Sequence, residues 1–452
     1  MMKTLLAIAL AVVAVPPAAT AAKGFAVHQD NAVPQLLVPG DSVQVGYSTD
    51  SSGVKSLGGT LFVRTDLQRR FSPLALAGKG HAVSTILPAR FLRGHRLIYY
   101  AVIRDTKGKR SVTTGKRSAW ILQRPVVVGL GTHVYGQTRQ PDAVVARASA
   151  AEVGWDTGGE FNLGPQTLNV APDGSAWLQD SYNSRLLVWR PGQPDSFART
   201  VPLPGFAGGG DFVFGRDGTI YASSPGFLGS DPLLFHLSPS GEVFWSAQLP
   251  AALKGAGELA LRVGPDGTIY GEVGGEQTQA LGGPSGDWGW LPVATATGKA
   301  LPVAYQARHT VWGYQPLAGG LRLISAVYTP PRSQQGPKDV RYALIGHSGR
   351  AVRAWRVLSR TQIFPGGGPF FTPELVGGDP VIDLDVARPG QLEHVVLRLG
   401  PHSAEARFSL PYSIFGEGTS YADLRIGPDG KLYRLSTSPT NGVTISRYSL
   451  QP

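Results

Sequence analysis

Short apolar segments alternate with polar turns along most of the chain, and Gly164–Trp189 shows this pattern most completely. Its apolar runs are rich in strand-forming residues, while the stretches between them contain proline, aspartate, asparagine and glycine, which favour turns. The expected order is strand Thr167–Val170, turn Pro172–Gly174, strand Ala176–Leu178, turn Asp180–Asn183 and strand Leu186–Trp189. The segment therefore predicts three antiparallel strands joined by two tight turns.

The Asp-Gly turn and its flanking strands recur at Asp217-Gly218, Asp266-Gly267 and Asp429-Gly430. The first three turn glycines follow one another at intervals of 44 and 49 residues, close to the period of about 40–50 residues of a four-stranded propeller blade. The last interval, 163 residues, leaves room for two degenerate blades, which we expect in Gly319–Ser359 and Gly378–Leu410. The sequence therefore predicts an all-β fold with a six-bladed β-propeller, in which the repeated turn aspartates serve the scaffold.

The first copy also matches a known repeat. A Gly-Pro lead, an Asp-Gly turn and an Asp-x-x-Asn-x-Arg pattern are present at Gly164, Pro165, Asp173, Gly174, Asp180, Asn183 and Arg185. This copy resembles an NHL repeat, and the other copies keep only the Asp-Gly turn and an aromatic residue, at Tyr221, Tyr270 and Tyr433. The resemblance implies a β-propeller, and proteins of this and related propeller groups range from binding scaffolds to enzymes.

The first residues have the features of an export signal. Lys3 precedes the apolar run Leu5–Val15, which is followed by the small residues Ala19–Ala21. This order predicts a signal peptide over residues 1–22 and a mature protein that is secreted or periplasmic. No later apolar stretch approaches the ~20 residues of a membrane helix, so no membrane span is expected in the mature chain.

Residues 23–125 differ from the repeats that follow. They contain short alternating strands, and we expect a disulfide-free immunoglobulin-like β-sandwich there. Within Leu97–Arg104 the neighbours Tyr99 and Tyr100 point to opposite faces, so one of them is expected in the core. Residues 126–452 are assigned to the NHL-like β-propeller.

The last blade lacks one strand. Only two convincing strands, Lys431–Leu435 and Val443–Leu450, follow the final Asp-Gly turn. A propeller avoids open sheet edges when a strand from the other end of the ring completes its last blade. We therefore expect residues before Gly164 to close the ring, and Ala143–Val153 is either that strand or a short helix.

The charge and the cysteine content of the chain limit the kinds of partner and metal site that we expect. The chain has no cysteine, which excludes disulfides and thiolate metal sites. The formal charge is +11, and the densest basic clusters, Gln68–Arg70 and Lys107–Arg117, suit either an anionic envelope polymer or, more simply, solvated hairpin tips. Nucleic acid is not expected as a partner, since no recognition motif accompanies the basic residues.

Polar candidates for a site fall into two groups. Asp180, Asn183 and Arg185 either bind a ligand or hold a turn together. Asp383 and Asp385 lie two residues apart on one strand face and form a possible half-site for a hard metal ion, or else flank the solvent side of that strand. Histidines show no metal-binding spacing, although His309, His347 and His394 fall within the expected blades.

Aromatic residues favour a binding role. Trp288 and Trp290 lie in a glycine- and proline-rich insertion of the third blade, where exposed rings would form a platform for a sugar or a protein, unless they pack into the core. We therefore expect an exported, non-enzymatic binding protein whose propeller face recognises a glycan or an exported protein, with no cofactor. The alternative is a lyase- or lactonase-type enzyme with a divalent metal at the propeller channel, and a purely structural role in the envelope stays open.

Overall fold

The computed structural model describes residues 25–31, 33–51, 54–105, 110–158, 164–204, 210–224, 233–249, 260–273, 289–302, 311–312, 317–331, 338–366, 373–415 and 422–451. The chain forms two compact units, one containing residues up to Val33 with Pro39–Ile121, the other Pro34–Val38 with the chain from Leu122 onward. The expected signal peptide, residues 1–22, lies outside the described residues. None of the described helices has the length and apolar character that a membrane crossing requires.

The N-terminal unit is built from antiparallel strands in the hydrogen-bonded order β1-β3-β6-β5-β4-β7-β9, with β8 paired to β7. They are β1 His28–Asn31, β3 Val43–Ser48, β4 Leu57–Thr65, β5 Ser72–Lys79, β6 Ala82–Leu87, β7 Arg96–Asp105, β8 Ser111–Thr113 and β9 Arg117–Ile121, with the short helix η1 at Ala89–Leu92. Tyr99 on β7 is buried, while Tyr100 points to the other face and stacks on Phe62 at 4.9 Å. The prediction that one of the two tyrosines lies in the core is confirmed.

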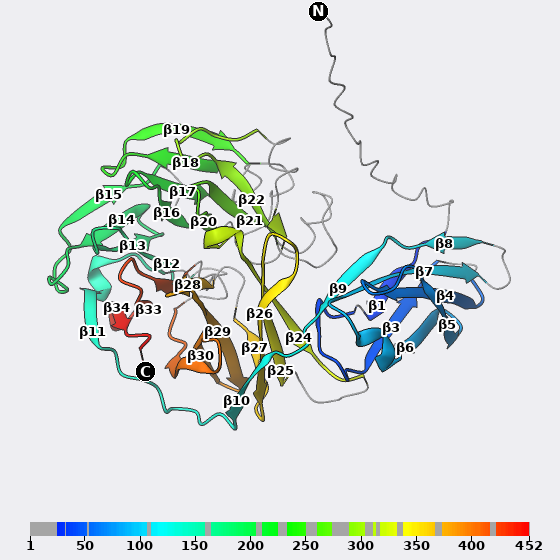
Figure 1. Cartoon of the computed structure of the whole chain (residues 1–452). Coiled ribbons are helices and arrows are strands. Elements are labelled where there is room, and N and C mark those ends of the chain that lie inside the picture. The colour runs from blue at the N-terminus through cyan, green and yellow to red at the C-terminus, as the bar shows by residue number, and fades with distance from the viewer. Residues whose placement is uncertain are drawn as a thin grey trace, which may run out of the picture. The chain divides into compact units, whose positions relative to one another are not determined.

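The C-terminal unit is a β-propeller of six sheets that follow one another in a ring (Figure 1). We number these blades 1 to 6 in chain order and give their strands from the inside outwards. Blade 1 consists of β12 Thr167–Val170, β13 Ala176–Asp180, β14 Arg185–Trp189 and β15 Arg199–Pro202, and blade 2 of β16 Phe212–Phe214, β17 Ile220–Ser224, β18 Leu233–Leu237 and β19 Val243–Gln248. Blade 3 consists of β20 Leu261–Val263, β21 Ile269–Val273, β22 Gly289–Ala294 and β23 Val311–Trp312, and blade 4 of β24 Arg322–Tyr328, β25 Asp339–Ile345, β26 Ala351–Ser359 and β10 Val126–Gly131. Blade 5 consists of β27 Phe364–Pro365 with β28 Glu374–Val376, then β29 Asp379–Arg388, β30 Gln391–Leu399 and β31 Ala404–Pro411, and blade 6 of β32 Leu424–Ile426, β33 Leu432–Ser438, β34 Gly442–Tyr448 and β11 Ala143–Ala148.

The six-bladed architecture agrees with the repeat analysis. Strands β24 to β26 of blade 4 and β29 to β31 of blade 5 correspond to the two segments in which degenerate blades were expected, whereas β10, β27 and β28 lie outside those segments. The short strand β2, Leu36–Leu37, contacts β24 and β25 of blade 4. Two further short helices complete the described elements of this unit, η2 at Ala150–Glu152 and η6 at Ala318–Gly320.

The Asp-Gly motif forms the same turn wherever it occurs. In blade 1, Oδ1 of Asp173 accepts hydrogen bonds from the backbone nitrogen and the hydroxyl of Ser175, at 2.9 and 2.6 Å. Gly174 follows with a φ of 81°, a conformation that other residues adopt only with strain. In the later copies, Oδ1 of Asp217, Asp266 and Asp429 likewise accepts a hydrogen bond from the backbone nitrogen two residues on, and the glycine that follows each aspartate has a positive φ. The aspartates are turn formers, as predicted.

Two strands from before blade 1 complete sheets elsewhere in the ring. β11 pairs with β34 in antiparallel fashion and forms the outer edge of blade 6. This confirms closure by residues before Gly164, and the helical interpretation of Ala143–Val153 is wrong for the six residues of β11. β10 pairs in parallel with β26 and completes blade 4, a long-range pairing that no local pattern announces.

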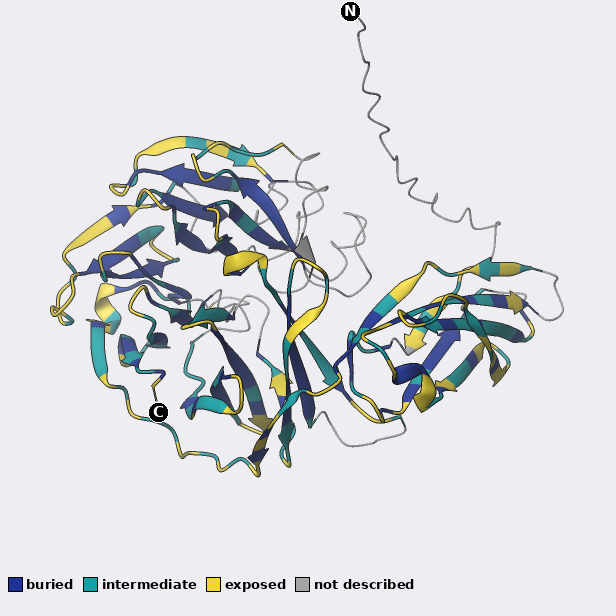
Figure 2. Ribbon diagram, in the orientation of Figure 1, coloured by how far each residue is buried: buried dark blue, intermediate teal, exposed yellow. Residues whose placement is uncertain are grey.

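The core of the propeller lies between neighbouring blades. One apolar cluster joins blades 6 and 1, another blades 1 and 2, and others join blades 2 and 3, 4 and 5, and 5 and 6. Figure 2 shows the middle strands of the blades as buried, whereas outer strands such as β15 and β19 alternate towards solvent. Blades 1, 2, 5 and 6 therefore contribute to an apolar cluster on both faces, blades 3 and 4 on one face, and every blade depends on a neighbour for cover.

Trp355 on β26 provides a test of this packing. Its ring is fully buried between blades 4 and 5, and its Nε1 donates to the carbonyl oxygen of Gly400 at 2.7 Å. We expect Trp355→Ala to lower the free energy of unfolding by about 3–5 kcal/mol in chemical denaturation. Val352→Ala, on the same strand but 55% exposed, should change it by no more than about 0.5 kcal/mol. Equal losses in the two variants would contradict packing between blades as the source of stability.

His236 on β18 is held in an apolar, aromatic environment. It is buried, its ring stacks on Tyr221 at a centroid distance of 4.4 Å, and its Nε2 lies 2.9 Å from the hydroxyl of Thr219. Burial lowers the pKa of His236, and the opposing effect of Asp217 does not compensate. The folded state therefore disfavours the protonated imidazole.

This lowered pKa predicts a pH dependence of stability. Because the unfolded chain binds the proton more readily, the stability that His236 contributes is present above its unfolded pKa, about 6.5, and is lost as the pH falls through the folded pKa. The free energy of unfolding of the wild type should therefore decline more steeply than that of His236→Gln between pH 8 and pH 5. Parallel pH profiles of the two proteins would refute this assignment.

Candidate functional site

Asp180, Asn183 and Arg185 come together at the second turn of blade 1. Oδ2 of the fully buried Asp180 accepts hydrogen bonds from Nδ2 of Asn183 at 2.9 Å and from Nε of Arg185 at 2.7 Å. Oδ1 of Asp180 accepts one from the nitrogen of Gly154 at 2.9 Å, and Arg185 also donates to the carbonyl oxygen of Glu152 at 2.6 Å. These residues fasten the turn to the segment that leads from β11 into the blade, and a ligand role for them stays a prediction.

The expected aromatic platform is not formed by Trp290. This residue lies on β22 and is 1% exposed, with the guanidinium carbon of Arg262 5.6 Å from the centre of its ring. Of the two alternatives for this residue, an exposed platform or a place in the core, the second is confirmed, because β22 extends further into the insertion than its glycine and proline content suggested. Trp288 and His309 lie outside the described residues, and His347 is exposed on the turn between β25 and β26.

A cavity of about 410 Å³ lies at the end of the ring that carries the Asp-Gly turns. We call it the channel cavity, because the innermost strands of blades 1, 2, 3, 5 and 6 line it together. Its polar wall contains Asn169, Arg262, Glu374 and Arg425, and its apolar wall includes Phe214 and the prolines of three Asp-Gly turns. The cavity thus joins residues that lie as far apart in sequence as blade 1 and blade 6.

Asp211 holds the two arginines of the channel cavity in place. Its fully buried carboxylate accepts hydrogen bonds from Nη1 of Arg262 at 2.9 Å and from Nη2 of Arg425 at 2.9 and 3.0 Å. The backbone nitrogens of Phe212 and Leu261 also donate to it, each at 2.8 Å. These hydrogen bonds offset the free-energy cost of burying the carboxylate.

The surroundings shift the pKa values of the cavity side chains. Burial, together with repulsion from Arg425, lowers the pKa of Arg262 to about 10 although Asp211 opposes the shift. Burial raises the pKa of Glu374, against the attraction of Arg425 and Arg262. The cavity wall therefore carries two cations and one acidic group, and Asp211, which binds both arginines, supplies the second negative charge, so that these charges nearly cancel.

The repeats contained a signal for these residues that sequence reasoning missed. Arg262 and Arg425 occupy the same place in the copies LRVGPDG and LRIGPDG, and Asn169 occupies it in LNVAPDG. Equivalent positions on innermost strands point to one channel, so aligning the copies would have identified the polar wall. Asp211 and Glu374 lie outside the motif and needed the three-dimensional structure.

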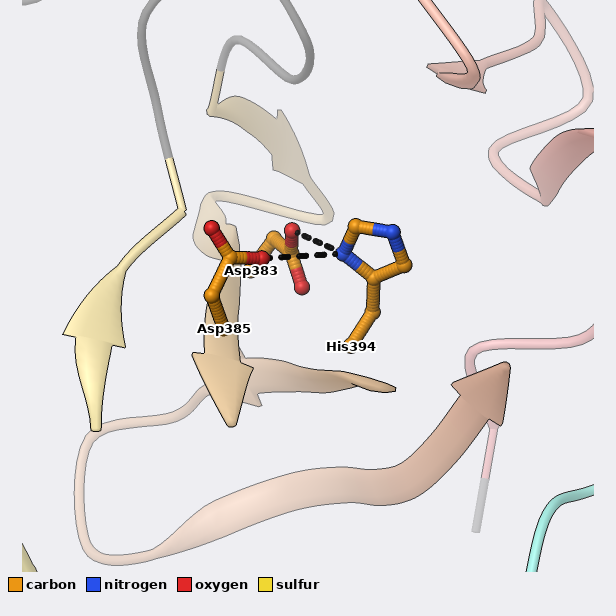
Figure 3. A group of neighbouring side chains, drawn as sticks. All are labelled: Asp383, Asp385 and His394. Carbon is orange, nitrogen blue, oxygen red and sulfur yellow. Dashed lines mark hydrogen bonds and ion pairs between the residues drawn. The ribbon is translucent and has the colours of Figure 1, made fainter. Parts of the chain in front are cut away.

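A second polar group lies between blades 5 and 6. Asp383 and Asp385 on β29 share one face, and His394 lies opposite Asp385 on β30 (Figure 3). Nδ1 of His394 is 2.8 Å from Oδ2 of Asp383 and 3.2 Å from Oδ1 of Asp385, while its Nε2 is 3.3 Å from Oδ2 of Asp423, just before β32. We call these four residues the His394 cluster.

The His394 cluster is almost closed to solvent. The side chains of His394, Asp383 and Asp423 are 3%, 1% and 3% exposed, and that of Asp385 is 31% exposed. The expectation that the two aspartates flank the solvent side of their strand is therefore wrong for Asp383, because blade 6 covers this face of β29. None of the cluster residues lines the channel cavity.

Electrostatics in the His394 cluster are dominated by burial and by the mutual proximity of its groups. Burial alone would lower the pKa of His394, but Asp383, Asp385 and Asp423 outweigh it and raise the pKa well above its usual value. Burial raises the pKa of Asp383 to about 6 despite His394. Tyr412, whose ring centre lies 5.6 Å from that of His394, has its pKa raised to about 12 by burial and then by Asp423.

Neither the known protein-family models nor the curated proteins match this chain. Its class therefore rests on the fold and on these two groups of residues, which define a six-bladed β-propeller with a polar channel cavity and a separate carboxylate–histidine cluster.

The buried pairing of Asp211 predicts a large effect of a small change. In Asp211→Asn the two guanidinium groups lose their common negative partner, so the free energy of unfolding should fall by about 3–5 kcal/mol. Asp195→Asn is the matched control, because Asp195 pairs with Arg147 at the surface, where the two side chains are 70% and 54% exposed; its effect should be below about 1 kcal/mol. Denaturant titration of both variants measures the difference, and a loss below 1 kcal/mol in Asp211→Asn would disprove the network's role.

Proposed function

We propose that this protein is an exported, non-enzymatic binding protein whose propeller holds a sugar unit of a glycan in the channel cavity. The observation that carries the proposal is the cavity itself. Its volume of about 410 Å³ falls in the range of roughly 300–1,000 Å³ of small-ligand sites. A cavity of this size suits one or two units of a polymer better than a folded protein partner.

The cavity wall offers chemistry suited to a sugar. Arg262 and Arg425 supply donors, Glu374 supplies acceptors, and a sugar hydroxyl both donates and accepts. Phe214 and the turn prolines add apolar surface against which the C–H face of a sugar ring packs. Because Asp211 and Glu374 nearly balance the two arginines, a densely anionic ligand gains less here than a neutral or singly charged one.

The identities of the two units are also proposals. In the N-terminal unit, β1-β3-β6 and β5-β4-β7-β9 follow the strand order of the two sheets of a sandwich, and the pairing of β5 with β6 joins them along one edge. This strand order supports an immunoglobulin-like fold. In blade 1 the contacts of Asp180 with Asn183 and Arg185 give the motif residues a structural role, which supports an NHL-like propeller. Export rests on the signal-peptide pattern of residues 1–22.

A lyase- or lactonase-type enzyme is the weaker proposal. It requires acidic or histidine groups that meet a substrate at the channel, whereas the carboxylate–histidine cluster lies between blades 5 and 6. Among the described residues that line the channel cavity, Glu374 is the one acidic group. The two arginines beside it are tied to Asp211, and guanidinium groups do not act as a general base.

A carbohydrate panel tests the binding proposal. The purified full chain is titrated with neutral, amino and acidic mono- and oligosaccharides, and binding is followed by calorimetry. We expect at least one sugar class to bind with one site per chain. Glu374→Gln should weaken this binding about tenfold or more, since losing a hydrogen bond to a charged group costs about 1.5–3 kcal/mol.

Glu242→Gln is the control for this experiment, because Glu242 is exposed on the turn before β19, outside the channel cavity. The affinity of this variant for the sugar should equal that of the wild type. Binding that survives Glu374→Gln unchanged, or a panel in which no sugar binds, would reject the channel cavity as a glycan site.

A further inference from the structure

We propose that Asp383, Asp385 and His394 bind one divalent transition-metal ion, Zn²⁺ or Mn²⁺, between blades 5 and 6. The inference does not rest on glycan binding, because the His394 cluster and the channel cavity share no residues. The three ligand atoms are Oδ2 of Asp383, Oδ1 of Asp385 and Nδ1 of His394.

The spacing of these atoms fits a metal shell. All three ligand atoms lie within 4.8 Å of one another, and the two distances to Nδ1 are 2.8 and 3.2 Å. Metal–ligand bonds of about 2.0–2.2 Å place neighbouring ligand atoms about 3.0–3.5 Å apart. The residues are therefore nearly in position, and small side-chain rotations centre an ion among them.

Buried atoms without partners point in the same direction. Among the described residues, Oδ1 of Asp383 and Oδ1 of Asp423 are buried and have no hydrogen-bond partner. Nor does any lysine or arginine of the described chain pair with these three aspartates, so three carboxylates face a single imidazole. Buried carboxylates are normally paired with cations or coordinate metals, and a divalent ion supplies the missing positive charge.

Metal binding also explains the position of Asp423. A metal on Nδ1 requires the imidazole proton to reside on Nε2, which lies 3.3 Å from Oδ2 of Asp423. Nε2–H then donates to this carboxylate, which fixes the tautomer and the ring orientation of the ligand. Asp423 is thus a positioning residue from blade 6 for a metal ligand of blade 5.

The donor set selects the class of metal. Imidazole nitrogen with two carboxylates suits Zn²⁺ and Mn²⁺, whereas Ca²⁺ and Mg²⁺ prefer shells made of oxygen alone. Asp385 is the partly exposed member, so an ion enters from its side and keeps a water there. Gly366 borders the other side, where a Cβ atom would lie 2.5 Å from Oδ2 of Asp383, so only glycine fits beside the carboxylate.

Metal titration of the untagged full chain, stripped beforehand with a chelator, tests the proposal. We expect one Zn²⁺ or Mn²⁺ per chain by elemental analysis, a melting temperature that rises with the concentration of that ion, and at least tenfold weaker binding of Ca²⁺ and Mg²⁺. Asp385→Asn should weaken Zn²⁺ binding at least tenfold. Because this side chain is partly exposed, the variant should fold, which circular dichroism without metal verifies.

Two further variants test the positioning role of Asp423 and control for the loss of a surface charge. Asp423→Asn keeps all three ligands and should weaken binding about 10- to 100-fold, while the visible absorption of bound Co²⁺ shows that the ligand set is retained. Asp195→Asn, at the exposed pair with Arg147, should bind like the wild type. The proposal would be overturned if neither Zn²⁺ nor Mn²⁺ binds, or if they bind equally well to Asp385→Asn. Weaker binding of these ions than of Ca²⁺ would overturn it too.

Discussion

The propeller depends on one constraint, which is that its blades have both faces buried. All five residues of β13 and all seven of β25 are buried, so neither face of these sheets is made for solvent. A row of such sheets would leave its two end faces bare, whereas a ring gives every sheet two neighbours. Burial of apolar surface between sheets, at about 25 cal/mol per Å², thus favours the closed arrangement over an open one.

The two polar groups follow from the same geometry in different ways. Innermost strands converge on one axis, so a single position of the repeat brings Asn169, Arg262 and Arg425 into one cavity. The His394 cluster instead lies where apolar packing between blades 5 and 6 is interrupted, beside Val381, Val396 and Leu424. One group faces an open space that a ligand can fill, and the other is sealed except at Asp385. Their chemistry differs accordingly, with arginines held by one carboxylate in the first and carboxylates around one imidazole in the second.

Local signals in the sequence were sufficient for the repeat but not for the contacts between distant segments. The Asp-Gly turns are short-range structures fixed by Asp173 and Gly174 and their copies, so blade number and blade positions followed from spacing. Asp383 and Asp385 were recognised as neighbours on one face because strand alternation has a period of two. His394 and Asp423 reach them only through the pairing of β29 with β30 and the packing of blade 6, which no spacing reveals. Trp290 was misplaced for a related reason, since glycine and proline content marked a loop where β22 in fact continues.

The outer strand of blade 6, β11, comes from a segment that precedes blade 1, and this has a consequence for biosynthesis. β11 emerges from the ribosome before any of the six blades is complete, yet its partner β34 follows all the other strands of the ring. Throughout elongation the nascent chain therefore carries an unmatched sheet edge at its front and a growing, uncapped stack of sheets behind it. Closure of the ring awaits the synthesis of β34, which makes the pairing of β11 with β34 the step most exposed to misassociation.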